Sequence, residues 1–400
     1  MYEVNGPPGA EPQEPAWLGK IEWDSSGARM EVRNGAGASI KQRVAAESRG
    51  GALELLLKTL WAGKASEIGA ASEVEVVGHR VVQGGRNFRE ATRLTAETRR
   101  TIAALAPIAP LHNLAELEGM EIVERLFGAV PQVAVFDTAF HRGMPEHARL
   151  YAGPYEWKEM GIQRYGFHGI NHQYCAERAA HLLGRELNAL RIVTCHLGNG
   201  CSLAAIQGGR SIDTTMGFTP LEGLMMGTRS GSVDPAIVTY LMREKDLSAQ
   251  QIDEVLNEKS GLMGISGISN DMREIVRAMR EGNPRAKLAF VMFVYRLRLF
   301  IGAMSAALQG LDVLVFSGGI GENSRDVREE TCKGLEFLGV KFDAKKNAES
   351  QGDYEISRWD SRVPVLVIRA QEDWAIAREC WRIAEQPGRP PAPERIEEFT

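Results

Sequence analysis

The chain has 400 residues, 44% of them hydrophobic and 25% charged, and its formal net charge is −5. This length favours two domains over a single core, and the acidic balance argues against a nucleic-acid partner, which would need a basic surface. The five cysteines form no Cys-x-x-Cys pair, so we expect buried free thiols in a cytoplasmic protein and no zinc site. The first residues are polar and rich in proline and glycine, unlike a signal peptide.

The first half of the chain predicts strands and helices in alternation. Apolar runs bounded by glycine and polar residues indicate strands, and apolar residues three or four apart indicate helices. The predicted elements are strands at 17–23, 29–33, 74–82 and 132–136, and helices near 51–61, 89–105 and 115–127. The last of these strands presents Asp137 at its C-terminal end.

A glycine-rich turn, His196–Gly200, joins two apolar strand-like runs at 191–195 and 201–206. Asn199-Gly200 is typical of a β-hairpin in which both turn residues adopt positive φ. The glycines on either side of Asn199 leave backbone N–H groups uncovered, so that a phosphate group can approach closely. This turn alone fits a phosphate-binding loop and a plain structural hairpin equally well.

The remaining elements are mainly helical. We predict helices at 172–184, 234–245, 248–259, 272–281, 285–309 and 372–385, and strands at 312–316 and 363–368. The longest apolar stretch, 288–308, carries Arg296 and Arg298, which favours a buried helix over a membrane span. Four prolines after residue 385 predict a disordered tail over 386–400.

A second glycine-rich turn, Ser317–Ser324, lies between the strand at 312–316 and a helix predicted over 326–338. This arrangement favours a nucleotide site, because free amides at a helix N-terminus attract anionic or polar groups; a tight structural turn is the alternative. The turn matches neither the Gly-x4-Gly-Lys-Ser/Thr loop nor the dinucleotide fingerprint. Strands and helices that alternate predict an α/β protein with its site at the strand ends.

Eight motifs in a fixed order over residues 77–324 resemble those of acetate kinases. No motif is specific alone, but the ordered set is. The motifs are VGHRVV at 77–82, PLHN at 110–113, FDTAFH at 136–141, RYGFHG at 164–169, HLGNG at 196–200, MGTRSG at 226–231, GISGISNDMR at 264–273 and GIGENS at 319–324, with Glu372 matching beyond them.

The resemblance implies an α/β, two-domain actin-like ATPase fold with ribonuclease-H-like duplicated domains and a cleft between them. One domain would comprise 1–138 and 371–400, and 139–370 would form the nucleotide-binding domain. The implied reaction is reversible and depends on Mg²⁺, with Mn²⁺ as an alternative: the γ-phosphoryl group of ATP passes to acetate, giving acetyl phosphate and ADP. The implied protein is a cytoplasmic homodimer with no nucleic-acid or membrane partner.

The chain departs from the family at its start. Acetate kinases begin with a strand and an Asn-Ala-Gly-Ser-Ser-Ser-Leu-Lys-type phosphate loop, whereas Met1–Val4 resembles the end of the strand that follows this loop. Asn34–Lys41 imitates the loop, but it is too close to Arg80 in the sequence to replace it. A misplaced start codon is the simplest explanation, and we expect residues 1–400 alone to be unstable or nearly inactive.

Acetate needs no general base, because a free carboxyl titrates near pH ~4–5 and is ionised at neutral pH. Catalysis must instead neutralise charge as a carboxylate approaches a triphosphate. The resemblance places Arg80 and Arg229 beside acetate and the transferring phosphoryl group, and His168 in contact with the transition state. Asp137 matches an essential aspartate, which we expect to orient a magnesium-bound water or an arginine.

Glu372 resembles the magnesium-linked glutamate of the family, with a helix-start carboxylate as the alternative. His112 is a further motif position. Val82, Leu111, Phe167 and Pro220 resemble the pocket around the acetate methyl group, although each is also a plausible core residue. For ATP, the resemblance implies phosphate contacts from His196, Leu197, Gly198, Asn199 and Gly200, nucleoside contacts from Asp271, Met272 and Arg273, and adenine-side contacts from Gly319, Ile320, Gly321, Glu322 and Asn323.

Two other functions stay open at this point. A propionate kinase of the same family differs by one methylene in its substrate, which a pocket distinguishes by only ~1–3 kcal/mol. A non-catalytic nucleotide-binding protein would result from loss of the first phosphate loop. The DNA upstream of Met1 would separate these functions, because an in-frame loop sequence favours the enzyme and a stop codon favours the inert protein.

Overall fold

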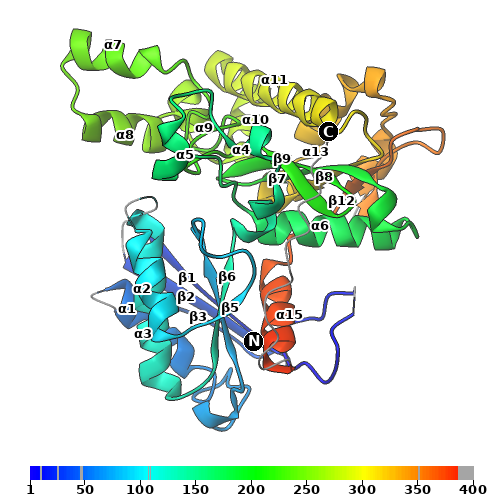
Figure 1. Ribbon diagram of the computed structural model, residues 1–400. Coiled ribbons are helices and arrows are strands. Elements are labelled where there is room, and N and C mark those ends of the chain that lie inside the picture. Colours follow the sequence, from blue (N-terminus) through cyan, green and yellow to red (C-terminus); the bar gives the residue numbers. More distant parts are fainter. Residues whose placement is uncertain are drawn as a thin grey trace. The chain divides into compact units, whose positions relative to one another are not determined.

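The computed structural model describes residues 1–9, 11–24, 27–45, 48–106, 108, 110–349 and 352–385, without the side chains of 24 and 110–112. The tail predicted over 386–400 lies outside these residues. The chain divides into two compact units. Unit 1 comprises Met1–Ala139 and the segment from Asp373, and unit 2 comprises Phe140–Glu372 (Figure 1).

Unit 1 contains two three-stranded sheets. The first is an antiparallel meander in the order β1-β2-β3. The second has the order β4-β6-β5, with β4 and β6 parallel and β5 antiparallel to β6. The strands are β1 (Trp17–Asp24), β2 (Gly27–Asn34), β3 (Ser39–Val44), β4 (Val77–Val81), β5 (Thr92–Arg93) and β6 (Gln132–Phe136).

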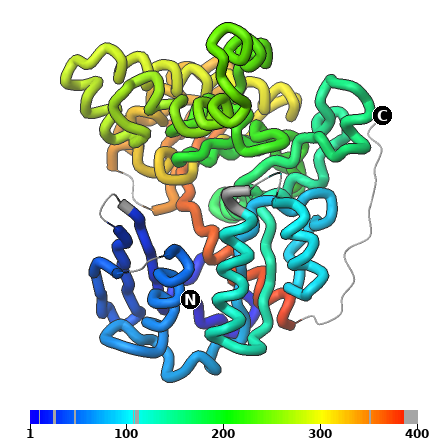
Figure 2. The backbone as a smooth tube through the Cα atoms, turned by 90° about the vertical axis from the view of Figure 1, so that its left-hand side faces the viewer, coloured from blue at the N-terminus to red at the C-terminus, as the bar shows by residue number. Residues whose placement is uncertain are grey.

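The helices of unit 1 pack against both of its sheets. They are α1 (Arg49–Lys58), α2 (Ala96–Ala104), α3 (Pro110–Phe127) and α15 (Glu372–Glu385), with a 3₁₀ turn at Ala71–Glu73. A Cβ on Gly78 of β4 would lie 2.4 Å from Ile376 Cγ2 and 2.6 Å from Cys380 Sγ, so only glycine lets α15 pack this closely. Figure 2 shows the red α15 returning to the unit that holds the blue N-terminal strands.

Unit 2 is built on a mixed six-stranded sheet in the order β11-β12-β10-β7-β8-β9. Its central strand β10 runs parallel to both β7 and β12, and all five of its residues are buried. Buried apolar runs are typical of central parallel strands. The strands are β7 (Arg191–Leu197), β8 (Cys201–Gln207), β9 (Arg210–Thr214), β10 (Val313–Ser317), β11 (Tyr354–Glu355) and β12 (Val365–Val367).

Helices α6 and α11 cover opposite faces of the unit 2 sheet (Figure 1). The α-helices of unit 2 are α4 (Glu146–Arg149), α5 (Glu156–Met160), α6 (Gly169–Leu182), α7 (Ala236–Lys245), α8 (Ala249–Glu258), α9 (Gly261–Ser266), α10 (Met272–Arg280), α11 (Pro284–Ala307), α12 (Gly318–Asn323), α13 (Arg325–Lys333) and α14 (Ala344–Glu349). Short 3₁₀ turns occur at Ala139–Gly143, Leu187–Ala189 and Glu336–Leu338.

Helix α11 is long and apolar enough, by length and composition alone, to cross a membrane. Its Phe290, Phe293 and Leu297 are nevertheless at most 5% exposed, and the helix packs against α9, α10 and β8. These contacts make it a core helix of unit 2, which confirms the buried helix predicted at 285–309. All five cysteines are buried and free, as predicted.

The structure corrects the predicted geometry of both glycine turns. His196–Gly200 does connect an antiparallel hairpin, but neither Asn199 nor Gly200 has positive φ. The loop between the paired Leu197 and Cys201 has three residues, so the two-residue turn geometry does not apply. The predicted loop at Ser317–Ser324 is mostly the short helix α12, which begins directly after β10 with Gly318 at φ +77°.

Other predicted elements differ in length. The helix at 89–105 is shortened to α2, because Thr92–Arg93 pairs with β6 and the Thr95 hydroxyl caps the helix at Thr98 N–H. The helix at 326–338 divides into α13 and a 3₁₀ turn. Asn34–Lys41, the segment that imitates a phosphate loop, contains the turn of the β2–β3 hairpin, where the Asn34 side chain accepts a hydrogen bond from Ala38 N–H at 2.8 Å.

Candidate active site

A group of histidines gathers where β7, β8 and α6 meet in unit 2. His168 is the residue before α6, and its φ of +55° is in the left-handed region that non-glycine residues rarely adopt. Its ring stacks on that of His196 at 4.1 Å between centroids. A strained backbone that holds a polar side chain in a fixed place is typical of functional positions.

The hydroxyl of Ser202 connects His168 to a second, fully buried histidine. Ser202 Oγ lies 2.8 Å from His168 Nδ1 and 2.8 Å from His172 Nε2, while His172 Nδ1 lies 2.7 Å from Thr194 Oγ1. Burial lowers the pKa of His172 well below its usual value, so this ring is neutral. Since a hydroxyl has one proton, Ser202 donates to one ring and accepts from the other, which fixes the orientation of His168.

Asn171 links the histidine group to the end of β10. Its side-chain amide lies 2.8 Å from His196 Nδ1 and donates to Ser317 Oγ at 3.2 Å. Asn171 and Ser317 are each 1% exposed. The C-terminal ends of the neighbouring parallel strands β7 and β10 are therefore joined by side chains, as predicted for an α/β site.

Arg229 and His168 converge on Gly200. A Cβ at Gly200 would lie 3.4 Å from Arg229 Nη1 and 3.4 Å from His168 Cε1. These distances are ordinary van der Waals contacts, so the two side chains lie directly against Gly200, whose backbone is not in the left-handed region. The sequence predicted Gly200, His168 and Arg229 as site residues separately, and unit 2 brings the three together.

Arg229 lacks a carboxylate partner among the residues that the structure describes. Its Nη1 donates to Pro220 O at 3.3 Å, and burial lowers its pKa from the usual value. Transferring a cation out of water without a counter-charge is unfavourable. An anionic ligand would supply the missing counter-charge, so Arg229 is suited to bind an anion.

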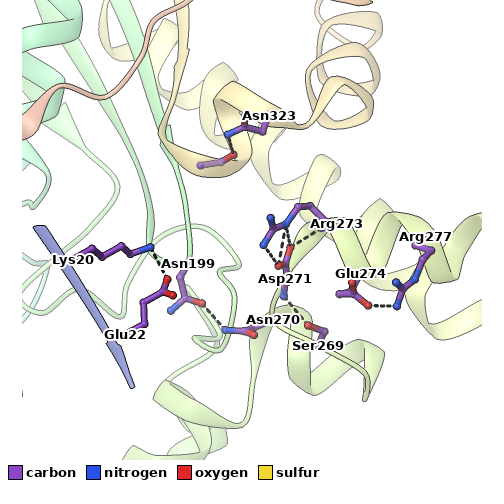
Figure 3. A network of polar contacts seen from close by, with 11 residues as sticks. Lys20, Glu22, Asn199, Ser269, Asn270, Asp271, Arg273, Glu274, Arg277 and Asn323 are labelled. Atoms are coloured by element: carbon purple, nitrogen blue, oxygen red, sulfur yellow. Dashed lines mark hydrogen bonds and ion pairs between the residues drawn. The ribbon is translucent and has the colours of Figure 1, made fainter. Parts of the chain in front are cut away.

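The loop around Asn199 is tied to the segment before α10 (Figure 3). Asn270 donates to Asn199 Oδ1 at 3.0 Å, and Asn199 O accepts from Gly227 N–H at 3.0 Å. Asp271 caps α10 by accepting from Arg273 N–H at 2.8 Å, and it also pairs with the Arg273 side chain, which is 86% exposed. The capping bond gives Asp271 a structural role whether or not it contacts a nucleoside.

Glu322 holds α12 against the segment before α15. Its Oε1 accepts from Gly318 N–H and from Ala370 N–H, both at 2.9 Å, and burial raises its pKa. Asn323 donates to Gly319 O at 2.8 Å (Figure 3). Met272, Leu197 and Gly321 are buried, whereas Gly319 and Asn323 are exposed.

Arg328 is a buried cation that sequence reasoning missed. It is 1% exposed, and it donates to Gly321 O at 2.8 Å, Glu322 O at 2.7 Å and Asn347 Oδ1 at 2.8 Å. These bonds satisfy carbonyls at the end of α12, which has no following helical turn to do so. Nothing in the sequence distinguishes Arg328 from the exposed charged residues of the same helix.

Replacing Arg328 with Ala should reduce the free energy of unfolding by about 3–5 kcal/mol, because it creates a cavity and leaves buried carbonyls without donors. Urea denaturation followed by circular dichroism measures this loss. Arg325→Ala, at an exposed position of the same helix, is the matched control and should cost under about 0.5 kcal/mol. Equal stability of the two variants would contradict the role given to Arg328.

Unit 1 holds a second group of predicted site residues at the ends of β4 and β6. Arg80 Nε and Nη2 donate to the two carboxylate oxygens of Asp137 at 3.1 Å and 2.6 Å. The pair forms because β4 and β6 are parallel and in register, with Val81 opposite Phe136. Asp137 is 1% exposed whereas the Arg80 side chain is 40% exposed, so the buried carboxylate orients a cation that reaches solvent.

Glu116 of α3 is a third charged residue beside this pair, and it belongs to none of the sequence motifs. Its Oε1 accepts from Val82 N–H at 3.0 Å, while Oε2 is buried without a hydrogen-bond partner. Burial raises the pKa of this carboxyl to about 7. In the sequence, Glu116 lies one helical turn before Met120, which is buried. The two residues therefore share a helix face, and a carboxylate is unusual on a buried face.

The remaining predicted residues are placed as follows. Phe167 is 1% exposed, and its carbonyl lies 3.1 Å from His141 Nε2, while Val82 is 9% exposed. The side chains of Leu111 and His112 lie outside the described part of the chain. Glu372 is the first residue of α15 and is half-buried.

The described residues contain no group of three or more histidine, cysteine or acidic side chains suited to hold a metal ion. Magnesium, however, usually binds one or two carboxylates and completes its shell with water and phosphate oxygens. Of the carboxylates near Cys175, Glu322 is held by two backbone amides and Asp353 by the Arg178 side chain. Glu372, the third carboxylate of this group, is the first residue of α15.

Known proteins resemble this chain over nearly its whole length. The sequence profile of the Acetokinase family matches residues 10–378. An acetate kinase from Cyanothece sp. (strain PCC 7425 / ATCC 29141) is 54% identical over 387 residues, which cover 96% of this chain and 95% of the relative.

Two crystal structures share the fold. An acetate kinase from Porphyromonas gingivalis has a TM-score of 0.86 at 41% identity, covering 93% of this chain and 94% of that one. A propionate kinase from Francisella tularensis has a TM-score of 0.85 at 37% identity, covering 92% and 93%. The α/β, two-domain actin-like ATPase fold predicted from the motifs is confirmed, and the chain belongs to the acetokinase family.

Proposed function

We propose that the protein catalyses the reversible transfer of the ATP γ-phosphoryl group to acetate, giving acetyl phosphate and ADP. The observation that carries the proposal is Arg229, a half-buried guanidinium without a carboxylate partner among the described residues, which meets the oriented His168 ring over Gly200. Transfer of a phosphoryl group between two anionic oxygens requires a cation beside the transferring group.

In this proposal unit 2 binds the nucleotide. His196–Gly200 contacts the phosphates, Asp271–Arg273 the nucleoside, and Gly319–Asn323 the adenine side. Mg²⁺ arrives with ATP, and Glu372 supports it, directly or through water. When bound, the ion neutralises charge on the phosphate oxygens. Arg229 and His168 then hold the transferring group, with His168 kept in one orientation by Ser202 and His172.

Unit 1 supplies the acetate contacts in this proposal. Arg80, oriented by Asp137, attracts the carboxylate, and Val82 contributes apolar surface for the methyl group. We propose Leu111 and His112 as further acetate contacts of unit 1, and Phe167 and Pro220 as the acetate contacts of unit 2. Acetate acts as the nucleophile in its ionised form, so no residue has to remove a proton from it.

The test is acyl phosphate formation, with hydroxylamine trapping the product as a hydroxamate. With ATP, Mg²⁺ and acetate the protein should form acetohydroxamate, and omission of either ATP or acetate should abolish it. Assaying residues 1–400 beside a chain extended upstream of Met1 tests the expected need for the first phosphate loop. Failure of both forms with every short carboxylate would refute the proposal.

Propionate is the competing acceptor, because a propionate kinase is among the similar structures. One extra methylene changes binding by only ~1–3 kcal/mol. The kcat/KM ratio for the two acids therefore decides the substrate. A ratio above one in favour of propionate would replace acetate in the proposal and leave the reaction type unchanged.

We also propose that the protein is a homodimer. Leu288, Val291, Tyr295 and Leu299 form a stripe along α11, and each is 51% to 58% exposed. Their spacing of three and four residues puts them on one helix face. An apolar stripe of this length is unfavourable in water unless another surface covers it, and a symmetric pair of α11 helices would bury both copies.

Replacing Val291 and Tyr295 together with Glu should produce a monomer, because the dimer would bury like charges against each other. Light scattering after gel filtration measures the mass, and circular dichroism should be unchanged because both sites are exposed. Trp359→Glu, at a 92% exposed position elsewhere, is the control and should stay dimeric. A wild-type monomer, or a dimer that survives the double substitution, would refute this interface.

A further inference from the structure

Glu116 has a position and an environment that the proposed reaction does not use. It belongs to α3, whose mid-section packs against β4. Val82 N–H, the first amide beyond the β4 strand, donates to Glu116 Oε1 at 3.0 Å. This bond holds the carboxyl beside the end of the strand that carries Arg80. The other oxygen, Oε2, is buried without a partner.

Two charges act on Glu116 besides its burial. The Asp137 carboxylate disfavours a second negative charge, and the Arg80 guanidinium favours it. Burial is the largest effect, and it raises the pKa of Glu116 to about 7. An unpartnered buried oxygen has the same consequence, because a protonated carboxyl is less costly to bury than a carboxylate.

Several charged groups on the elements that pack against α3 have partners of their own. His79 of β4 bonds to Gln132, Arg99 of α2 pairs with Glu124, Lys58 and Arg125 pair with Glu54 of α1, and Glu73 accepts from Gly69 N–H and Ala70 N–H. His112 precedes Glu116 by one helical turn, and its side chain lies outside the described residues. Arg80, Asp137 and Glu116 therefore form one charge group, which we call the Arg80 cluster.

We propose that Glu116 sets the affinity of the Arg80 cluster for an anionic substrate by gaining and losing a proton. With Glu116 protonated, the charges of Arg80 and Asp137 cancel, and the cluster is neutral. With Glu116 ionised, the cluster carries one net negative charge and repels a carboxylate. This inference rests on the proposed role of Arg80 in binding acetate. It makes Glu116 an affinity-determining residue that acts through Arg80 and does not take part in phosphoryl transfer.

The sign of the effect follows from the protonation states. Below about pH 7 Glu116 is neutral and acetate binds tightly, and above it the carboxylate weakens binding. Acetate is itself ionised across this range and adds no pH dependence. By linkage, acetate should raise the proton affinity of Glu116 as much as the proton raises the affinity for acetate.

The experiment measures the Kd of acetate by calorimetry and its KM by the hydroxamate assay, from about pH 5.5 to about pH 8.5, to bracket the titration. For the wild type, both constants should rise roughly three- to tenfold with pH, as expected for a coupling of a half to one pKa unit. Glu116→Gln is neutral at every pH and should keep the low-pH value of both constants throughout.

Glu118→Gln is the matched control, because Glu118 lies on the same helix and is exposed. It should follow the wild type, and all three proteins keep His112, so titration of that residue cancels in the comparison. A Kd in Glu116→Gln that rises with pH as in the wild type, or a wild-type Kd that does not change with pH, would overturn the inference.

The binding measurement separates this inference from the proposed reaction. If acetate binds with the expected pH dependence but no acyl phosphate forms, the proposed reaction fails and the role of Glu116 stands. If acyl phosphate forms but Glu116→Gln does not flatten the pH dependence, the inference fails and the reaction stands. Absence of acetate binding by the wild type at every pH would also overturn the inference.

Discussion

Replacing Arg229 with Ala should lower kcat by about 10³-fold while the KM for ATP changes by less than about threefold. An arginine that stabilises the transferring phosphoryl group is worth roughly 10³–10⁵ in rate, because its charge acts mainly in the transition state. Nucleotide affinity depends on other residues of unit 2 and should persist. Steady-state kinetics with varied ATP and saturating acetate measures both constants.

The stability of Arg229→Ala should not fall with its activity. Among the described residues, the Arg229 guanidinium donates a hydrogen bond to the Pro220 carbonyl and lacks a carboxylate partner. Removing a half-buried cation that the fold does not neutralise should leave the urea midpoint unchanged or higher. A structural arginine would behave like Arg328, whose loss is expected to destabilise the protein.

Two further variants make this prediction specific. Arg229→Lys keeps the positive charge but loses the planar fork, and it should recover only part of the rate. Arg277→Ala removes a surface arginine that pairs with Glu274 on α10 (Figure 3), and it should have wild-type kinetics. Arg229→Ala with an unchanged kcat would remove this residue from the active site.

The sequence predicted strands and long helices well because their signals are local. The apolar run of β10 and the long apolar helix α11 are examples, and each needed only its own residues to be recognised. The failures occurred where the conformation depends on distant contacts. The His196–Gly200 loop is an example, since Asn199 bonds to Gly227 N–H and to the Asn270 side chain, which a local turn rule cannot reveal.

Motifs predicted candidate site residues but not the groups that orient them. His168 was selected from its motif, whereas His172 and Ser202, which fix its ring, have no signal of their own. The predicted helix began at residue 172, three residues after the true start of α6. This error hid the one-turn spacing between His168 and His172. Glu116 was missed for a related reason, since its importance depends on the register of α3 against β4.

Replacing Asp137 with Asn should lower kcat by about 10²-fold or more without changing the shape of the pH profile of kcat at saturating acetate. Asn has the same shape, but it exchanges a charge-assisted bidentate contact to Arg80 for one weaker hydrogen bond. Arg80 would then lose its fixed orientation, and small misplacements of a charged group reduce rates by this amount. The pH profile should persist because ionised acetate offers no proton for Asp137 to take.

A double-mutant cycle with Arg80 tests whether the two residues act as one unit. Asp137→Asn, Arg80→Ala and the double variant should have similar kcat, since either change alone removes the oriented cation. Their stabilities should differ. Arg80→Ala leaves a carboxylate that is 1% exposed without its cation and should cost about 3 kcal/mol, whereas Asp137→Asn leaves Arg80 at 40% exposure in contact with water and should cost about 1 kcal/mol.

Metal dependence distinguishes the arginine-orienting role from a role in binding Mg²⁺. If Asp137 acts through Arg80, excess Mg²⁺ or Mn²⁺ should not restore the rate of Asp137→Asn, because the missing interaction is with a guanidinium. Partial rescue by metal would instead assign Asp137 to a magnesium-bound water. Loss of the acidic limb of the pH profile, with no response to metal, would show that Asp137 transfers a proton. The bidentate contact at 3.1 Å and 2.6 Å favours the first outcome, since it directs both carboxylate oxygens toward the arginine.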